Sequence, residues 1–262
     1  MNTAPHTESA TGSAAPSLDK DPRRIEGMFD AIAHRYDQLN HLLSVGLDRR
    51  WRRQAVAALD LPDGALVIDV CTGTADLAIT AARHRAAPHS VIGIDFAGAM
   101  LVLGRRKILA DGLGDVVRLV RGDACRLPSP SMAVDAVTVG FGIRNVADIE
   151  LAIAEMFRVL KPGGRLVILE FGEPRLPVLR AIYLWYFRRV LPRIGQLLSK
   201  HAEAYAYLPA SVSTFLSPGD LAVLLRTSGF CQVRVDRLTL GVVYLYVGRK
   251  PGEGERGNPV YR

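Results

Sequence analysis

From residue 65 to residue 171, short runs rich in β-branched residues alternate with longer runs whose apolar residues recur every three or four positions. The first kind of run is typical of strands and the second of amphipathic helices. The strand-like runs are 65–70, 90–95, 116–123, 134–140 and 165–171, and the helix-like runs are 76–85, 98–110 and 148–160. Because the strand-like runs are apolar on both faces, the alternation predicts a parallel sheet covered by helices.

The two ends of this region extend the pattern. Residues 217–230 have helical spacing, and two strand-like runs, 231–238 and 242–250, follow with a short link that favours a hairpin. Apolar spacing within 23–59 predicts two N-terminal helices that cap the domain. Five parallel strands and an antiparallel pair give a seven-stranded, mostly parallel α/β sheet flanked by helices. This arrangement resembles the Rossmann-like fold of class I methyltransferases.

Composition limits the domain organisation. The chain has 262 residues and 49% hydrophobic content, which suffices for one α/β domain. Residues 1–22 and 251–262 lack apolar periodicity and are expected to be disordered tails, which leaves a single domain over 23–250. The three cysteines are widely separated and lack metal-ligand spacing, so we expect no disulfide framework, no metal and a cytoplasmic location.

The charge balance favours an anionic partner without choosing one. Lysine and arginine total 33 against 26 for aspartate and glutamate, which gives a formal net charge of +7. This charge suits a nucleic acid, an anionic membrane surface or an acidic ligand. The aromatic and basic strand motif of RNA-binding sheets is missing, so we expect no nucleic-acid partner. No window is apolar for long enough to span a membrane, which predicts a soluble or peripheral protein.

The sequence DVCTGTAD at 69–76 joins the first predicted strand to a helix, where nucleotide-binding folds place a cofactor turn. Asp69 ends the strand, Gly73 lies in the turn, and Asp95 ends the second strand roughly 20 residues later, a spacing typical of an acid that binds ribose hydroxyls. The glycines that a pyrophosphate requires are missing, and an adenosyl sulfonium does not need them. The turn therefore favours S-adenosylmethionine, and an ordinary turn with Asp76 as a helix cap is the alternative.

A third acid follows the third predicted strand. Asp123 could accept a hydrogen bond from an adenine amino group while the Ala124 amide donates to a ring nitrogen. The carboxyl ends of parallel strands meet at one edge of the sheet, so Asp69, Asp95 and Asp123 should share that edge. Each acid alone could be an ordinary loop residue, but the series favours a cofactor site.

Three segments resemble the signatures of the ubiquinone/menaquinone biosynthesis C-methyltransferases, namely MFDAIAHRYDQLNHLLSVGLDRRWRR, GFGIRNVADIELAIAEMFRVLKPGGRLVILEFGEP and RVLPRIGQLLS. The resemblance covers roughly residues 23–250, and FGIRNV and MFDAIAHRYD are its most specific parts. It implies transfer of a methyl group from S-adenosyl-L-methionine to a ring carbon of a demethylated polyprenyl quinol. Demethylmenaquinol is the expected acceptor, and the ubiquinone series stays open.

The resemblance also implies a set of donor-binding residues, with two departures from the family pattern. These residues are Asp69, Gly73, Thr74, Asp95, Asp123, Ala124 and Gly140. At Gly140 some relatives carry a serine whose hydroxyl could reach the donor. The turn has Thr72 and Ala75 where the family usually has glycine. A positive φ at Ala75 would cost roughly 1 kcal/mol, because only glycine visits that region freely.

Carbon methylation requires an electron-rich ring, so the reduced quinol should react and the quinone should not. On the family pattern, Arg144 and Asn145 follow the fourth strand and face the donor's methyl group. Arg144 stays protonated, so it would donate a hydrogen bond to the developing phenolate, and Asn145 would orient the ring. Tyr36, on the N-terminal helix that closes over the site in this family, would position the acceptor or the donor carboxylate.

Other interpretations of these residues stay open. Arg144 could instead form a salt bridge with a nearby acid such as Asp148. His34 and Asp37 are expected to be exposed helix residues and not the base. The sequence identifies no general base.

Residues 174–216 predict an inserted helical segment rich in aromatic and basic side chains. Val178, Ile182, Trp185 and Arg189 recur at helical spacing. Such a segment could cover a prenyl chain and make transient contact with an anionic lipid surface at the inner face of the cell membrane. A core or dimer contact is the alternative, so a homodimer also stays open.

Two other classes of function compete on the residues alone. One is a different S-adenosylmethionine-dependent enzyme, acting by O-methylation of a small molecule or on RNA. The other is a non-catalytic binding protein with a degenerate donor site, for which Thr72 and Ala75 are the argument. The retained Asp95, Asp123 and FGIRN favour an enzyme, and a calorimetric test of donor binding separates the two.

Overall fold

A computed structural model of the chain describes residues 21–44, 46–174, 176–185, 189, 207 and 210–255. Most of both predicted tails, at 1–20 and 256–262, lies outside the described residues, and so does most of the predicted insert between 186 and 209. Within the described ranges, no helix is long and apolar enough to cross a membrane.

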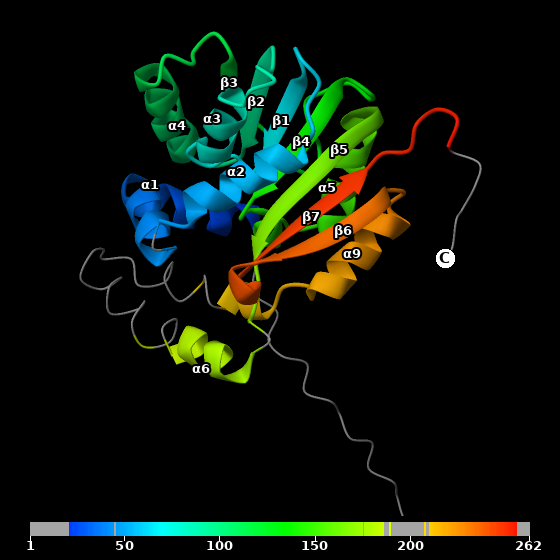
Figure 1. The fold of residues 1–262 in the computed structure, drawn as a ribbon. Coiled ribbons are helices and arrows are strands. Elements are labelled where there is room, and N and C mark those ends of the chain that lie inside the picture. The colour runs from blue at the N-terminus through cyan, green and yellow to red at the C-terminus, as the bar shows by residue number, and fades with distance from the viewer. Residues whose placement is uncertain are drawn as a thin grey trace, which may run out of the picture.

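A seven-stranded sheet in the order β3-β2-β1-β4-β5-β7-β6 forms the centre of the structure (Figure 1). The strands are β1 (Leu66–Val70), β2 (Ser90–Asp95), β3 (Val117–Arg121), β4 (Val134–Gly140), β5 (Leu160–Phe171), β6 (Cys231–Leu238) and β7 (Val243–Arg249). Strands β1 to β5 pair in parallel, whereas β7 is antiparallel to both β5 and β6. The predicted mostly parallel α/β sheet is confirmed.

In the C-terminal hairpin, β7 lies between β5 and β6, and β6 forms the edge of the sheet. Because β7 pairs with β5 and β6 lies outside it, β6 runs in the direction of the parallel strands and only β7 opposes them. The link between the two strands contains the short helix η3 (Thr239–Gly241). Thr239 Oγ1 accepts a hydrogen bond of 2.9 Å from the indole N–H of Trp51, which connects the hairpin to the N-terminal part of the chain.

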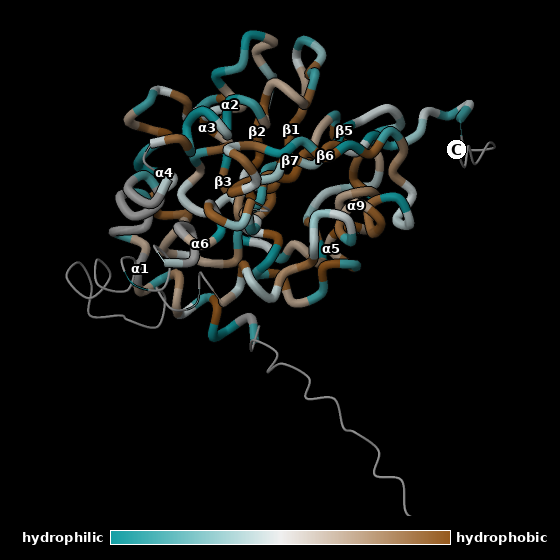
Figure 2. The backbone as a smooth tube through the Cα atoms, turned by 60° about the horizontal axis from the view of Figure 1, so that its bottom comes forward, coloured by the Kyte–Doolittle hydropathy of each residue, from teal (hydrophilic) through white to brown (hydrophobic). Residues whose placement is uncertain are grey.

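Helices cover both faces of the sheet. The helices of the described residues are α1 (Pro22–Leu43), α2 (Asp48–Ala58), α3 (Asp76–Ala82), α4 (Gly98–Ala110), α5 (Ile149–Val159), α6 (Pro177–Trp185) and α9 (Pro218–Thr227). Of these, α2, α3, α4, α5 and α9 pack against the strands. Along β1, Ile68 belongs to a core with α5 and α9, and Val67 belongs to a core with α2 and α3. Both faces of the strand are therefore buried, which explains why it is apolar apart from Asp69, and most of it is coloured brown in Figure 2.

Helix α1 packs mainly against α4, beside the carboxyl ends of the first strands (Figure 1). Phe29 and Ala33 of α1 form a small apolar cluster with Met100 of α4. The Asp30 carboxylate accepts a hydrogen bond of 3.0 Å from the backbone N–H of Ala99. The two predicted N-terminal helices are present as α1 and α2, and α1 reaches the edge where the sequence places its site.

Candidate functional site

A pocket lies at the carboxyl ends of β1, β2 and β4. Gly73, Asp95, Gly140 and Asn145 line it, so the fold brings four of the predicted site residues together. Phe29 of α1 adds an apolar wall.

The turn after β1 is strained in the manner that the sequence suggests. Cys71, Gly73 and Ala75 adopt φ values of 54°, 55° and 68°, all in the left-handed region. Glycine adopts this conformation freely, whereas alanine does so at a cost of about 1 kcal/mol. Ala75 is fully buried, and a methyl group added at Gly104 of α4 would lie 3.2 Å from the Ala75 methyl. Close packing of α4 thus fixes the turn in its conformation.

The side chain of Asp69 stabilises this turn. Its fully buried carboxylate accepts hydrogen bonds from Thr72 Oγ1 at 2.6 Å and from Thr138 Oγ1 at 2.7 Å. Burial raises the pKa of Asp69 to about 6, although the two hydroxyl groups act to lower it. Thr72, one of the two departures from the family's turn, therefore stabilises a buried carboxylate that a glycine could not reach.

Asp95 faces the pocket from the end of β2. Its Oδ2 accepts a hydrogen bond of 2.8 Å from the Gly73 N–H, and its Oδ1 accepts one of 2.9 Å from the Ala97 N–H. Burial raises the pKa of Asp95, and these backbone bonds oppose the rise. Each carboxylate oxygen has two lone pairs, so Asp95 keeps acceptor capacity for the hydroxyl groups of a ribose.

Asp123 and Ala124 follow β3 but do not belong to the described lining of the pocket. Asp123 Oδ1 accepts a hydrogen bond of 2.9 Å from the backbone N–H of Cys125, and Ala124 is buried against the core. Their predicted contacts with an adenine stay a prediction.

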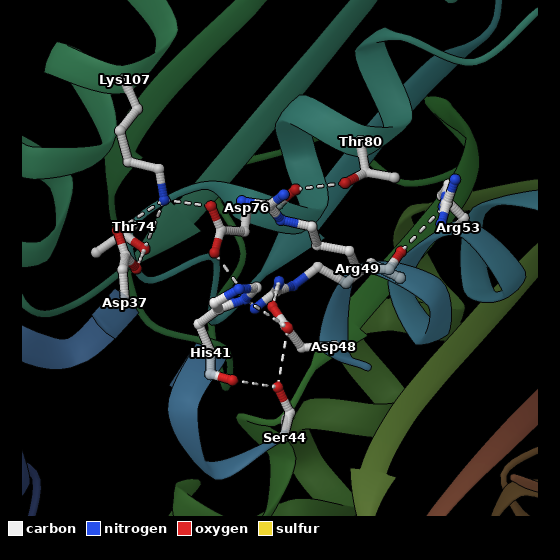
Figure 3. Close-up of polar contacts among 11 residues, drawn as sticks. Asp37, His41, Ser44, Asp48, Arg49, Arg53, Thr74, Asp76, Thr80 and Lys107 are labelled. Atoms are coloured by element: carbon white, nitrogen blue, oxygen red, sulfur yellow. Dashed lines mark hydrogen bonds and ion pairs between the residues drawn. The ribbon is translucent and has the colours of Figure 1, made fainter. Parts of the chain in front are cut away.

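Thr74 lies in the turn, and its side chain points toward α1 and α4 (Figure 3). The hydroxyl donates to Asp37 of α1 and accepts a hydrogen bond of 3.2 Å from Lys107 of α4. Lys107 also forms ion pairs with Asp37 and Asp76. Asp37, expected to be an exposed helix residue, instead links α1 to the turn, whereas His34 is exposed as expected.

Arg144 and Asn145 lie in the short helix η1 (Ile143–Asn145) after β4. The guanidinium of Arg144 donates a hydrogen bond of 2.7 Å to the fully buried Glu170 of β5, and it also donates to the Phe141 carbonyl and to Ser211 Oγ. The alternative interpretation of Arg144 named a salt bridge, and one exists, but with Glu170. Asp148 instead caps α5, where its side chain accepts a hydrogen bond from a backbone N–H.

Asn145 is buried and lines the pocket, and it has a partner that sequence reasoning missed. The hydroxyl of Tyr207 donates a hydrogen bond of 3.1 Å to Asn145 Oδ1. Tyr207 lies 62 positions further along the chain, so no local motif could have identified it. The backbone of Tyr36 lies in α1, and its side chain is outside the described residues.

Several carboxylates lie near Cys71, which lines the pocket. Burial raises the pKa of the Cys71 thiol well above its usual value, and the carboxylates of Asp95, Asp69 and Glu170 raise it further. Arg144 is the buried cation nearby, and Glu170 pairs with it. A sulfonium cation fits this environment, and the combination of a ribose-type acid with apolar walls suits an adenosyl group. Among the described residues, no group of histidine, cysteine and acidic side chains could hold a metal ion.

Comparison with known proteins gives a consistent result. A family model for the ubiE/COQ5 methyltransferase family matches residues 18–250. A demethylmenaquinone methyltransferase of Thermus thermophilus is 48% identical over 86% of this chain and 100% of its own length. One of Deinococcus radiodurans is 47% identical over 86% and 92%. A ubiquinone/menaquinone biosynthesis C-methyltransferase of Geobacter sulfurreducens is 43% identical over 89% and 91%.

Solved structures show the same fold at low identity. An S-adenosylmethionine-dependent methyltransferase of Thermotoga maritima aligns with a TM-score of 0.60 and 20% identity over 86% of this chain and 99% of its own. The [4+2]-cyclase SpnF aligns with a TM-score of 0.65 and 17% identity over 88% and 96%. Because a cyclase shares the architecture, the fold alone does not decide the reaction.

The buried Asp69 carboxylate predicts a pH dependence of stability. Its pKa is about 6 when folded and 3.8 in the reference state, so its contribution to stability is fully present below pH 3.8 and is lost as the pH rises through 6. The loss is on the order of 3 kcal/mol at most. We expect Asp69→Asn, which cannot ionise, to lose less free energy of unfolding between pH 4 and pH 7 in urea titrations. Parallel pH curves for the variant and the wild type would contradict this, and the exposed Asp63→Asn serves as the control.

The turn after β1 and the turn after β4 are in close contact, which predicts a steric effect of substitution. A methyl group at Gly142 would lie 2.3 Å from Cys71 Cβ, so Gly142→Ala should lower the free energy of unfolding by about 1–3 kcal/mol. The same change at Gly27 of α1 meets no atom within 4 Å and should stabilise the helix by about 1 kcal/mol. Thermal unfolding followed by circular dichroism should give shifts of opposite sign. Equal shifts would show that the turns are not in close contact.

Proposed function

The chain belongs to the ubiE/COQ5 methyltransferase family, and on this basis we propose that it methylates a ring carbon of a demethylated polyprenyl quinol. It is an S-adenosylmethionine-dependent methyltransferase of quinone biosynthesis. The observation that carries the proposal is the family match over 18–250, which contains the whole pocket and supports a single domain over 23–250. Demethylmenaquinol is the first acceptor to test, because the relatives at 48% and 47% identity are named for demethylmenaquinone. A ubiquinone-series quinol is the second.

The residues of the pocket suit the methyl donor. When bound, S-adenosyl-L-methionine supplies an electrophilic methyl group on a positively charged sulfur. Asp95 would accept hydrogen bonds from its ribose, and Gly73 allows close approach of the backbone. Gly140 lines the pocket too, and a side chain there would approach Leu77, since a Cβ would lie 3.0 Å from Leu77 Cδ2.

The reaction requires an electron pair from the acceptor ring. The ring carbon gives this pair to the new carbon–carbon bond as the carbon–sulfur bond of the donor breaks and its pair stays on sulfur. The ring carbon then releases its hydrogen as a proton. Loss of the neighbouring hydroxyl proton increases the electron density of that carbon, so a group that stabilises negative charge on the quinol oxygen should accelerate transfer.

Side chains of η1 and of α1 would bind and orient the acceptor. Asn145 lines the pocket and would contact the quinol ring. Arg144 would donate a hydrogen bond to the developing phenolate, directly or through water, and its contacts with Glu170 and the Phe141 carbonyl hold η1 in place. Tyr36 on α1 would position the acceptor or the donor carboxylate. Phe29 of α1 lines the pocket and would help to exclude water from it.

The prenyl chain of the acceptor needs an apolar surface, and α6 offers one. Val178 and Trp185 of α6 are exposed at 74% and 61%, and Leu176, which precedes the helix, is exposed at 52%. Helix α6 follows directly after the end of β5, near the carboxyl edge of the sheet (Figure 1). Together with the net charge of +7, this supports peripheral contact with an anionic membrane surface from the cytoplasm.

The central experiment supplies S-adenosylmethionine with a labelled methyl group and short-chain demethylmenaquinol that is kept reduced. We expect label in the ring of the quinol and none in the oxidised quinone. Asp95→Ala should weaken donor binding in calorimetry by roughly 10- to 100-fold, because it removes a charged acceptor for two hydroxyl groups. The exposed Asp63→Ala is the matched control and should bind as the wild type does.

Each outcome of this experiment has a meaning. Donor binding without ring methylation would indicate another acceptor, and a ubiquinone-series quinol or a phenol that is methylated on oxygen would be tested next. If Asp95→Ala bound S-adenosylmethionine as tightly as the wild type does, the proposed donor site would be wrong.

A second prediction concerns α6. Trp185→Ala should raise the KM for a long-chain quinol several-fold and leave the KM for a truncated quinol unchanged, because only the long chain would reach the exposed indole. Val223→Ala, which removes an exposed apolar side chain from α9, is the control and should affect neither substrate. Equal effects of Trp185→Ala on both quinols would contradict a role in prenyl binding.

A further inference from the structure

Two side chains from one short segment hold η1. Ser211 Oγ lies 3.3 Å from Arg144 Nε, and the Tyr207 hydroxyl lies 3.1 Å from Asn145 Oδ1. Tyr207 and Ser211 are four positions apart in the chain. They contact Asn145 and Arg144, two consecutive residues of the turn that borders the pocket.

We propose that Tyr207 is a positioning residue for methyl transfer. Its hydroxyl donates to the side-chain amide oxygen of Asn145 and so fixes the orientation of that amide. The amide NH₂ of Asn145 then faces the acceptor and donates a hydrogen bond to the quinol oxygen. This inference rests on the proposed function and extends it, because it names the group that receives the developing negative charge and the residue that orients that group.

The chemistry of an asparagine amide supports this role. One end of the amide accepts hydrogen bonds and the other end donates, so a partner fixed at one end decides what the other end offers. Tyr207 occupies the accepting end. Burial raises the pKa of Tyr207, so the hydroxyl keeps its proton at neutral pH and acts as a donor, not as a base.

The charges around the pocket make such a donor necessary. The carboxylates of Asp69, Asp95 and Glu170 all lie close enough to raise the pKa of Cys71, so they also oppose negative charge on a quinol oxygen. Glu170 already pairs with Arg144, the buried cation next to Asn145. A neutral N–H group held in a fixed orientation stabilises an oxyanion without needing to reorganise during the reaction.

The first test compares Tyr207→Phe with Tyr244→Phe, which removes a hydroxyl from a buried tyrosine on β7. Loss of one oxyanion donor typically lowers kcat about 100- to 1000-fold. Tyr207→Phe keeps the amide and loses only its orientation, so we expect a kcat roughly 10-fold lower, with the donor Kd and the melting temperature unchanged. Tyr244→Phe should keep the wild-type kcat. An unchanged kcat in Tyr207→Phe would overturn the inference.

A double-mutant cycle shows whether Tyr207 acts through Asn145. In an Asn145→Ala background, Tyr207→Phe should cause no further loss of kcat. Multiplication of the two effects would show that Tyr207 acts independently, which would overturn the inference. In a separate variant, Asn145→Asp keeps an acceptor for Tyr207 but has no N–H group, so it should be as inactive as Asn145→Ala.

A spectroscopic test does not depend on turnover. The probe is 4-nitro-1-naphthol, whose ionised form is coloured, bound in the presence of S-adenosylhomocysteine. We expect Tyr207→Phe to raise the pKa of the bound naphthol by about one unit, the equivalent of a 10-fold loss of oxyanion stabilisation. Equal pKa values in wild type and variant, or failure of the wild type to bind the probe, would overturn the inference. Absence of quinol methylation by the wild type would instead overturn the proposed function, and the probe would still report on Tyr207.

Discussion

Buried carboxylates at the carboxyl edge of the sheet are the constraint on which the rest of this structure depends. A carboxylate removed from water must be compensated, and the chain does so in three ways. Two threonine hydroxyls surround Asp69, whose pKa nevertheless rises to about 6. Backbone N–H groups surround Asp95. Glu170 pairs with Arg144. Each solution fixes a different loop of the pocket, because the compensating groups come from the turn after β1, from the residues after β2 and from η1.

The same requirement accounts for the strain around the pocket. Cys71, Ala75 and Phe141 all have positive φ, at the ends of β1 and β4, and such conformations persist only where the surroundings impose them. The close approach of Gly142 to Cys71 and of Gly104 to Ala75 leaves these turns no room to relax. Beside these rigid turns, α1 packs against α4 through the apolar cluster of Phe29 and Ala33 with Met100 and through ion pairs such as Lys107 with Asp37. Half-exposed ion pairs contribute little in water, so the apolar cluster is the larger contribution to this contact.

The sequence predicts the sheet and the acids at its strand ends better than it predicts the side-chain contacts around the pocket. Alternating strands and helices specify the parallel sheet, and the acids at the strand ends then share an edge by geometry alone, so Asp95 could be placed in the pocket from its position in the chain. The partner of Arg144 could not be placed in this way. The nearby Asp148 and the distant Glu170 are equally acidic, and only the pairing of β4 with β5 brings Glu170 to η1. In the sequence, Thr72 is only a departure from a glycine-rich turn. Its role becomes visible in the structure, where its hydroxyl donates a hydrogen bond to the Asp69 carboxylate. Tyr207 belongs to a segment whose aromatic residues indicated a lipid-binding surface, and nothing local distinguishes it from its neighbours.

The carboxylates around the pocket also distinguish the methyl donor from the product that remains after transfer. S-Adenosylmethionine carries a positive sulfur and its demethylated product does not, so the carboxylates of Asp69, Asp95 and Glu170 favour the donor over the product that remains after transfer. This difference assists release of the product. It also means that the acceptor, a neutral quinol that becomes partly anionic, enters a field that opposes its own activation. An oriented amide resolves this conflict, because it stabilises the oxygen locally without adding a positive charge that would weaken binding of the sulfonium. Pairing of Arg144 with Glu170 serves the same end, since an unpaired guanidinium beside the pocket would repel the donor.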